Sequence, residues 1–204
     1  MVSYDANTAL VVVDVQNDFA DPGGSLHVAG ADEVVARVNL EIGRAVRGGA
    51  TVVYTQDWHP ASTPHFAKDG GVWPVHCVAD SWGAELHPRL RVTGEIVRKG
   101  SNGEDGYSGF TMRDPVSGVE TPTPLEGMLR ERGIRGVVVV GLATDYCVNA
   151  TVLDARRLGF ETSVIVDACA PVNLQPDDGE EALAAMAAAG AQLATTGAPD
   201  EPPA

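Results

Sequence analysis

The chain has 204 residues, of which 44% are hydrophobic, and its formal charge at pH 7 is −14. That length suits one domain, assigned here to residues 1–197, and leaves a Pro-rich acidic tail at 198–204 that we expect to be frayed. The negative charge argues against a nucleic-acid partner, because phosphate binding needs clustered cations. No apolar run approaches the ~20 residues of a membrane span, which argues against a membrane protein.

The N-terminus and the cysteines indicate a cytoplasmic protein. Residues 1–5 show neither the basic region nor the apolar stretch of a secretory signal. The three cysteines, Cys77, Cys147 and Cys169, cannot all pair with one another, so reduced thiols are expected. Cys77 is interpreted as a packing residue and Cys169 as part of the core.

Buried strands and amphipathic helices alternate along the chain. The first strand is predicted over 9–15, and a helix closed by Gly48-Gly49 follows it. The apolar face of that helix repeats every 3.6 residues and comprises Val34, Val35, Val38, Ile42, Ala45 and Val46. The later strands are predicted over 51–56, 95–99, 137–140, 163–167 and 192–195. The later helices are predicted over 125–132, from about 144 to 157, and over 180–189.

This alternation with short connections predicts an α/β fold. We expect a three-layer α/β/α sandwich around a mostly parallel sheet of roughly six strands. Two segments, 58–93 and 101–124, interrupt the alternation and are rich in Gly, Pro and Ser. Loops of such length inside a domain are usually functional or disordered. No glycine-rich nucleotide motif follows the first strand, so nucleotide binding has no support.

Cys147 follows a valine-rich strand and is predicted to lie in the first turn of a helix, with Thr144 as a candidate N-cap. Free backbone N–H groups and the helix dipole would stabilise a thiolate there and lower the pKa of the thiol. The same N–H groups could hold an oxyanion. The alternative is that Cys147 is a small core hydrophobe.

Asp14 and Lys99 are predicted at the ends of two other strands, at the same edge of the sheet as Cys147. A thiol that attacks an amide needs a base to accept its proton, and a nearby ammonium favours the thiolate. Twelve of the fourteen basic residues are Arg. A lysine at position 99 therefore suggests a function that needs a compact ammonium and that Arg cannot perform. Taken singly, Asp14 could be a turn residue and Lys99 a solvated strand end.

Histidines gather on the loop after the second strand, where Asp57, His59, His65 and His76 fall within twenty positions. One carboxylate and three imidazoles suit one divalent metal ion, with Zn²⁺ preferred and Fe²⁺ and Mn²⁺ as alternatives. The alternative is a set of surface histidines with no shared partner. His27 and His87 have no suitable neighbours in the sequence and are predicted to be surface residues.

Six segments carry a family resemblance: Val13-Asp14-Val15-Gln16-Asn17-Asp18-Phe19, Asp57-Trp58-His59-Pro60, Trp73-Pro74-Val75-His76-Cys77, Arg98-Lys99-Gly100, Asp105-Gly106-Tyr107-Ser108-Gly109-Phe110 and Gly141-Leu142-Ala143-Thr144-Asp145-Tyr146-Cys147-Val148. They span about residues 8–170 and resemble the nicotinamidases (pyrazinamidases) of the isochorismatase-like cysteine hydrolases. One departure from the family is a longer segment at 111–124, which would alter the rim of the site.

The resemblance implies a role for each group of residues. It implies that Asp14, Lys99 and Cys147 form a catalytic triad. It implies an oxyanion site at the N–H groups of Ala143 and Cys147, beside a cis peptide bond between Leu142 and Ala143. The implied metal ligands are Asp57, His59, His65 and His76, and the implied pocket walls are Phe19, Trp73, Tyr107 and Leu142.

The expected activity is hydrolysis of nicotinamide, or of a pyrazinamide-like analogue, to the acid and ammonia through a thioester on Cys147, as in pyridine nucleotide salvage. Metal-bound water is an alternative nucleophile. A second hypothesis is another small-amide hydrolase of the same fold, of the N-carbamoyl or ureidoacrylate type. Such relatives usually lack the metal ligands. A silent metal- or partner-binding module is a third. The oligomeric state, including a homo-oligomer, stays open.

Overall fold

Six parallel strands form one sheet in the order β3-β2-β1-β6-β7-β8. Their bounds are β1 (Thr8–Val13), β2 (Thr51–Asp57), β3 (Glu95–Lys99), β6 (Gly136–Leu142), β7 (Glu161–Ala170) and β8 (Gln192–Ala194). The computed structural model describes residues 2–197, so the tail predicted at 198–204 lies outside the described residues. The prediction of a parallel sheet with roughly six strands is confirmed.

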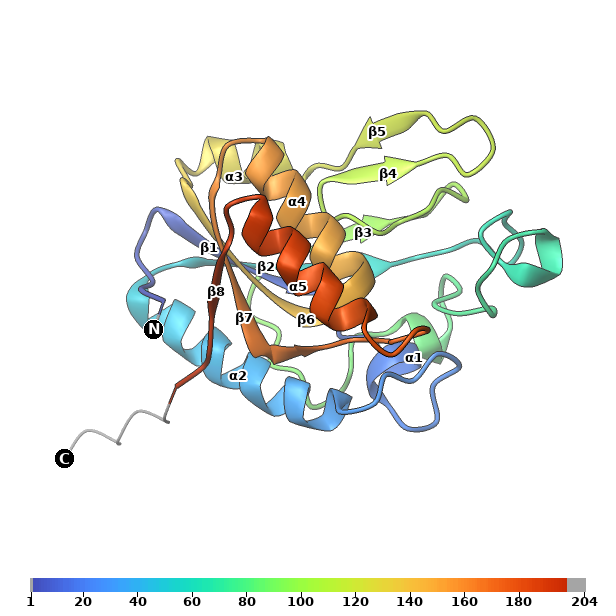
Figure 1. Cartoon of the computed structure of the whole chain (residues 1–204), viewed down its shortest axis with the longest axis horizontal. Coiled ribbons are helices and arrows are strands. Elements are labelled where there is room, and N and C mark those ends of the chain that lie inside the picture. The colour runs from blue at the N-terminus through green and yellow to red at the C-terminus, as the bar shows by residue number, and fades with distance from the viewer. Residues whose placement is uncertain (1, 198–204) are drawn as a thin grey trace.

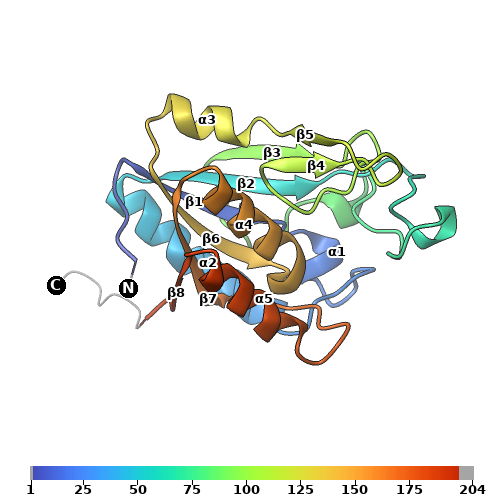
Figure 2. The ribbon, with the colours of Figure 1, turned by 45° about the horizontal axis from the view of Figure 1, so that its top comes forward.

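Helices cover both faces of the sheet (Figures 1 and 2). On one face lies α2 (Ala31–Gly48). On the other lie α3 (Leu125–Glu131), α4 (Asn149–Arg157) and α5 (Asp178–Ala188). The result is the three-layer α/β/α sandwich that the sequence predicts.

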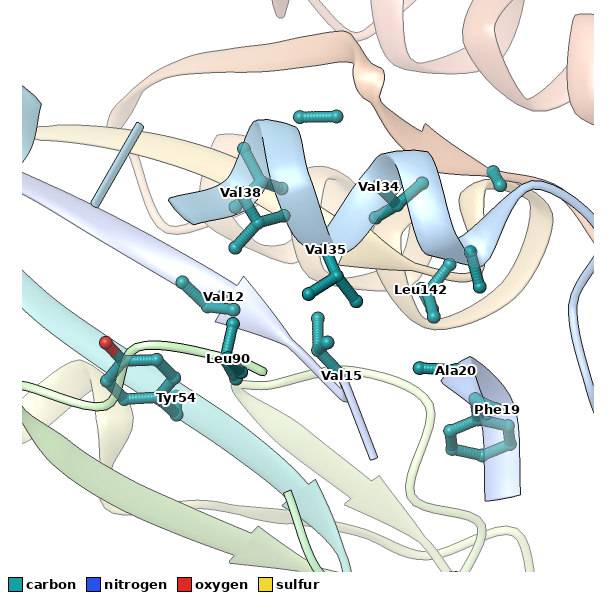
Figure 3. Packing of buried hydrophobic residues seen from close by; sticks show 14 of the residues in the cluster. Val12, Val15, Phe19, Ala20, Val34, Val35, Val38, Tyr54, Leu90 and Leu142 are labelled. Atoms are coloured by element: carbon teal, nitrogen blue, oxygen red, sulfur yellow. The ribbon is translucent and has the colours of Figure 1, made fainter. Parts of the chain in front are cut away.

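Successive residues of β1 serve two separate hydrophobic cores, which explains why the strand is apolar throughout. Leu10 and Val12 pack in the core beneath α2, while Val11 and Val13 pack in the core beneath α3, α4 and α5. Because alternate side chains of a strand point to opposite faces, a strand covered on both sides must be apolar at every position. Figure 3 shows Val34, Val35 and Val38 of α2 above the first of these cores.

The structure differs from the predicted elements at three places. Strand β1 ends at Val13 instead of residue 15, because Asp14 adopts φ 48°, a left-handed conformation that ends the strand. Val46, predicted on the buried face of α2, is 44% exposed in the last turn of the helix. Strand β7 extends beyond the predicted 163–167 to residues 161–170, and its pairing with β6 shifts register between Val139 and Gly141.

The long segment at 58–93 projects from the carboxyl edge of the sheet (Figure 1). It contains two short 3₁₀ turns, η1 (Ala67–Asp69) and η2 (Trp82–Ala84), and is tied together by bridges between His59 and Val78 and between Phe66 and Trp73. A short helix, α1 (Asn17–Ala20), follows β1 at the same edge.

The segment at 101–124 forms an antiparallel hairpin of β4 (Thr111–Arg113) and β5 (Glu120–Pro122). Within residues 2–197, no helix has the length and apolarity needed to cross a bilayer.

We predict that Phe160→Ala destabilises the protein strongly. Phe160 is fully buried, stacks on Phe110 with ring centroids 5.9 Å apart, and has the Arg130 guanidinium 4.0 Å from its ring centroid. Removing such a ring leaves a cavity and should lower the free energy of unfolding by roughly 3–5 kcal/mol, measured by urea denaturation. Val116→Ala is the control, because Val116 is 79% exposed and its truncation should change stability by less than about 0.5 kcal/mol. Equal effects of the two changes would contradict the packing described here.

Candidate active site

Three side chains from separate strand ends meet at the carboxyl edge of the sheet. Asp14 follows β1, Lys99 ends β3, and Cys147 lies beyond β6 in the helical turn η3 (Thr144–Val148). Lys99 Nζ is 2.7 Å from Asp14 Oδ2 and 3.8 Å from Cys147 Sγ, and all three side chains are buried. The structure thus brings the three predicted residues together.

The sheet topology accounts for this meeting. The strand order reverses between β1 and β6, and parallel sheets of this type bind ligands where that reversal leaves a crevice. Val13 pairs with Gly141, so Asp14 leaves the sheet beside Leu142, the last residue of β6. Gly141 adopts φ +118°, and a Cβ there would lie 2.1 Å from Val13 O, so only glycine permits this approach.

The turn that carries Cys147 differs from the prediction in its cap. Ala143 holds the N-cap position, and no side chain caps the helix, so Thr144 is its first residue and the prediction of a Thr144 cap is wrong. The turn is a single stretch of π-helix that leads into α4. The Leu142–Ala143 peptide bond is cis, as the resemblance implies.

Lys99 uses all its N–H donors inside the site. They point to Asp57 Oδ1 at 2.5 Å, to the carbonyl oxygen of Gly106 and to Cys147 Sγ at 3.8 Å, while Asp14 Oδ2 forms an ion pair with the ammonium at 2.7 Å. Asp14 is held from its other side by the hydroxyl of Thr55, which donates to Asp14 Oδ1 at 2.6 Å. The ammonium therefore has one fixed position between two carboxylates.

Two buried carboxylates share one buried ammonium, and this sets their protonation. Burial, only partly offset by Lys99, raises the pKa of Asp14 to about 6. Burial alone would raise the pKa of Asp57 too, but Lys99 and His59 hold it well below its usual range. Burial would lower the pKa of Lys99, yet the carboxylates of Asp14 and Asp57 keep it well above its usual range.

The expected lowering of the thiol pKa is wrong for this site. Burial raises the pKa of Cys147 well above its ordinary value, and Asp14 and Asp57 add to the rise while Lys99 opposes it. The helix start is insufficient to offset a dry location beside two carboxylates. Cys147 is therefore a thiol at rest, and a carboxylate oxygen of Asp14 lies within 4.8 Å of its sulfur, where an acceptor for its proton is needed.

Three histidines of the long loop form a cluster next to this group. The potential ligand atoms of His59, His65 and His76 all lie within 4.8 Å of one another, and all three residues are buried. His59 and His65 stack with ring centroids 4.7 Å apart, and His76 meets both edge-on at 5.3 Å. Burial lowers the pKa of His76 to about 4, so its ring is neutral at pH 7 and has a nitrogen lone pair to offer to a metal ion.

The side chains of this cluster have the properties of metal ligands. Both ring nitrogens of His59 are buried and have no hydrogen-bond partner among residues 2–197. A buried polar nitrogen without a partner is unfavourable unless a hydrogen-bond donor or a metal ion accepts its lone pair. Asp57 lies at the border of the two groups, with Oδ1 on Lys99 and Oδ2 3.8 Å from His59 Nε2. This donor set could hold a divalent metal ion.

A pocket opens onto the thiol and the histidines, with about 410 Å³ of space including its mouth. All four predicted wall residues line it: Phe19, Trp73, Tyr107 and Leu142. Ala143 and Cys147, the predicted oxyanion residues, also lie on its wall. Trp73 Nε1 donates to the Tyr107 hydroxyl at 2.7 Å, which joins two walls.

Several residues of the site are missed by the sequence reasoning. The pocket also includes Leu26 and Val172, which come from two loops, and Tyr146, which lies in η3. Thr55 is a polar residue in a strand predicted to be buried, a signal that could have identified it. The Gln16 side-chain amide donates to Asp57 O and accepts from Asp57 N–H, both at 2.8 Å. Gln16 lies in one of the segments that carry the resemblance, but nothing in the sequence indicates that it holds Asp57.

The remaining predictions on histidines and cysteines have mixed outcomes. His27 is exposed as predicted, but His87 is buried, because the chain there packs along β1 and its N–H donates to Val15 O at 2.9 Å. Cys77 is fully buried as a packing residue, whereas Cys169 is only half-buried at the margin of the core.

The two lysines of the chain form a matched pair for a stability test. We predict that Lys99→Met lowers the free energy of unfolding by roughly 3–5 kcal/mol at pH 7, because it leaves Asp14 and Asp57 buried without their cation. Lys68→Met should change it by less than about 1 kcal/mol, since Lys68 is exposed and its ion pair, with the neighbouring Asp69, is at the surface. Denaturation of both variants checks this, and a mild effect of Lys99→Met would contradict the described charge pairing.

Comparison with known proteins agrees with this geometry. The family model described as "Isochorismatase domain" matches residues 8–198. The chain is 42% identical over 205 residues to a nicotinamidase of Escherichia coli, covering 92% of this chain and 94% of that protein. The structure is similar to a pyrazinamidase of Pyrococcus horikoshii solved in complex with zinc (TM-score 0.82, 38% identity, 93% and 99% covered). It is also similar to a protein of L. infantum solved in complex with nicotinate (TM-score 0.85, 36% identity, 96% of each chain covered). The chain therefore belongs to the isochorismatase-like hydrolases, in the branch of the nicotinamidases.

Proposed function

We propose that this protein is a metal-dependent cysteine amidohydrolase that converts nicotinamide to nicotinate and ammonia. The observation that carries the proposal is the convergence of Asp14, Lys99 and Cys147 beside a cluster of three buried histidines. Cys147 lines the same pocket as two of these histidines, His65 and His76. The nicotinamidases to which the chain is similar support the substrate class. An aromatic pocket of this size suits a flat single-ring amide.

In the first half of the reaction, the Cys147 sulfur attacks the amide carbon while Asp14 accepts the thiol proton. A pKa of about 6 lets Asp14 act as a base near neutral pH and return the proton afterwards. Lys99, 3.8 Å from the sulfur, stabilises the thiolate that forms during this transfer. The backbone N–H groups of Ala143 and Cys147 would stabilise the oxyanion of the tetrahedral intermediate.

In the second half, the tetrahedral intermediate collapses as Asp14 gives its proton to the amide nitrogen. The carbon–nitrogen bond breaks, ammonia leaves, and a thioester on Cys147 remains. Asp14 then removes a proton from a water molecule that attacks the thioester carbon. The carbon–sulfur bond breaks, the acid leaves, and the proton returns to the sulfur.

His59, His65 and His76, with Asp57 beside them, are the residues that would hold the metal ion. The unpartnered ring nitrogens of His59 support this assignment. When bound, the ion supplies a Lewis acid that can accept the lone pair of a ring nitrogen in the substrate. Phe19 and Trp73 would hold the ring from its sides.

We predict that Cys147→Ala lowers ammonia release from nicotinamide by more than ~10³-fold, because the nucleophile is lost. Cys169→Ala is the matched control, since Cys169 is half-buried outside the pocket and should leave the rate within a few-fold of the unaltered protein. Substantial hydrolysis by Cys147→Ala would favour a water nucleophile and contradict the thioester route.

We also predict that chelation abolishes hydrolysis of nicotinamide and that adding back Zn²⁺, Mn²⁺ or Fe²⁺ restores it. The physical reason is that a buried cluster of three histidines cannot orient the ring without its ion. The measurement is ammonia release before chelation, after it, and after metal return. Full activity toward a non-pyridine amide after chelation would instead favour the small-amide hydrolase alternative.

A further inference from the structure

Asp105 makes a contact that the proposed mechanism does not use. Its Oδ1 lies 2.6 Å from Nδ1 of His65, a residue forty positions earlier in the chain. The side chains are 19% and 4% exposed, so the contact is largely shielded from water. With Nδ1 facing the carboxylate, His65 has only Nε2 to offer to the other histidines.

The histidines of the cluster differ in how their rings are held. Nδ1 of His76 faces the carbonyl oxygen of Pro74, only two residues away, at 2.8 Å. His59 has no hydrogen-bond partner on either ring nitrogen among residues 2–197. His65 is thus the member of the cluster whose ring is fixed by a carboxylate from a distant segment. Such partners of metal-binding histidines fix the ring and raise its basicity.

The position of Asp105 is itself fixed by the hairpin of β4 and β5. The backbone of Asp105 pairs with that of Arg113 in both directions, at 2.7 and 3.1 Å. Arg113 is the last residue of β4, and Thr111 at its start donates to Asp154 Oδ2 of α4 at 2.6 Å. The hairpin therefore connects the histidine cluster to the helix that continues from Cys147.

Hydrogen bonds within the turn of the hairpin also hold its backbone. Asp114 Oδ1 accepts hydrogen bonds from the backbone N–H groups of Val116 and Ser117, at 3.1 and 2.6 Å. A two-stranded hairpin is only marginally stable alone, so these bonds and the contact with α4 hold it in place. This hairpin lies in the segment whose length departs from the family pattern.

We infer that Asp105 is a positioning residue for the metal ion and that the β4–β5 hairpin is its support. The inference rests on the metal site of the proposed function. Asp105 holds His65 with Nε2 directed to the other histidines, and the hairpin holds Asp105. The segment at 111–124 thus acts on metal retention, and none of its residues lines the pocket.

The test measures the dissociation constant for Zn²⁺ of the metal-stripped full chain by competition with a chromophoric chelator. Asp105→Ala should weaken Zn²⁺ binding by roughly 10- to 100-fold, the range found when such partners are removed. Asp105→Asn should fall between this variant and the unaltered protein, because its amide oxygen can still accept from the ring. Glu104→Gln is the matched control: it removes the adjacent carboxylate, which accepts hydrogen bonds from Asn102 and none from the histidine cluster among residues 2–197, and should leave affinity unchanged.

Asp114→Ala tests the hairpin separately and should weaken Zn²⁺ binding by several-fold. Activity of the Asp105 variants should recover when Zn²⁺ is raised, which a merely structural defect would not allow. Unchanged affinity in Asp105→Ala would overturn the inference, and unchanged affinity in Asp114→Ala alone would overturn the part assigned to the hairpin. If the unaltered chain itself binds no metal, the proposed function fails on that point, and the inference fails with it.

Discussion

The site depends on one buried cation. Lys99 is fully buried, and its ammonium lies against the carboxylates of Asp14 and Asp57. Removing this charge from water is unfavourable and is compensated only because both carboxylates are within hydrogen-bonding distance. The same charge places Asp14 beside the Cys147 thiol and Asp57 beside the histidines. One side chain therefore joins the Cys147 sulfur, the proposed nucleophile, to the proposed metal site.

Much of the arrangement could be predicted from the sequence because parallel strands end at a common edge. Valine-rich runs identify β1 and β6, and the reactive residue that follows each must then lie at that edge. Asp57 and Lys99 are likewise partners in the register of β2 and β3. The parallel sheet and the shared edge thus follow from patterns that a single sequence contains, whereas the strand order was not predicted and comes from the structure.

Other features depend on packing that no local pattern encodes. The pKa of Cys147 is raised because its surroundings are dry and negative, whereas the sequence reasoning considered only the helix start and the Lys99 ammonium. His87 is buried because its loop returns along β1, and nothing near it in the sequence predicts that path. Asp105 lies in a recognised segment, but its partner His65 belongs to another loop. Such contacts join segments far apart in the chain and become visible only in three dimensions.

The central place of β1 has a consequence for biosynthesis. Thr8 of β1 pairs with Gly136 of β6, so one side of the first strand stays open until most of the chain has left the ribosome. Pairing between such distant segments is slow, and an apolar strand with an open edge can associate with other chains in the meantime. Slower translation at reduced temperature should therefore raise the yield of recoverable protein, and truncated chains that end before β6 should accumulate as aggregates.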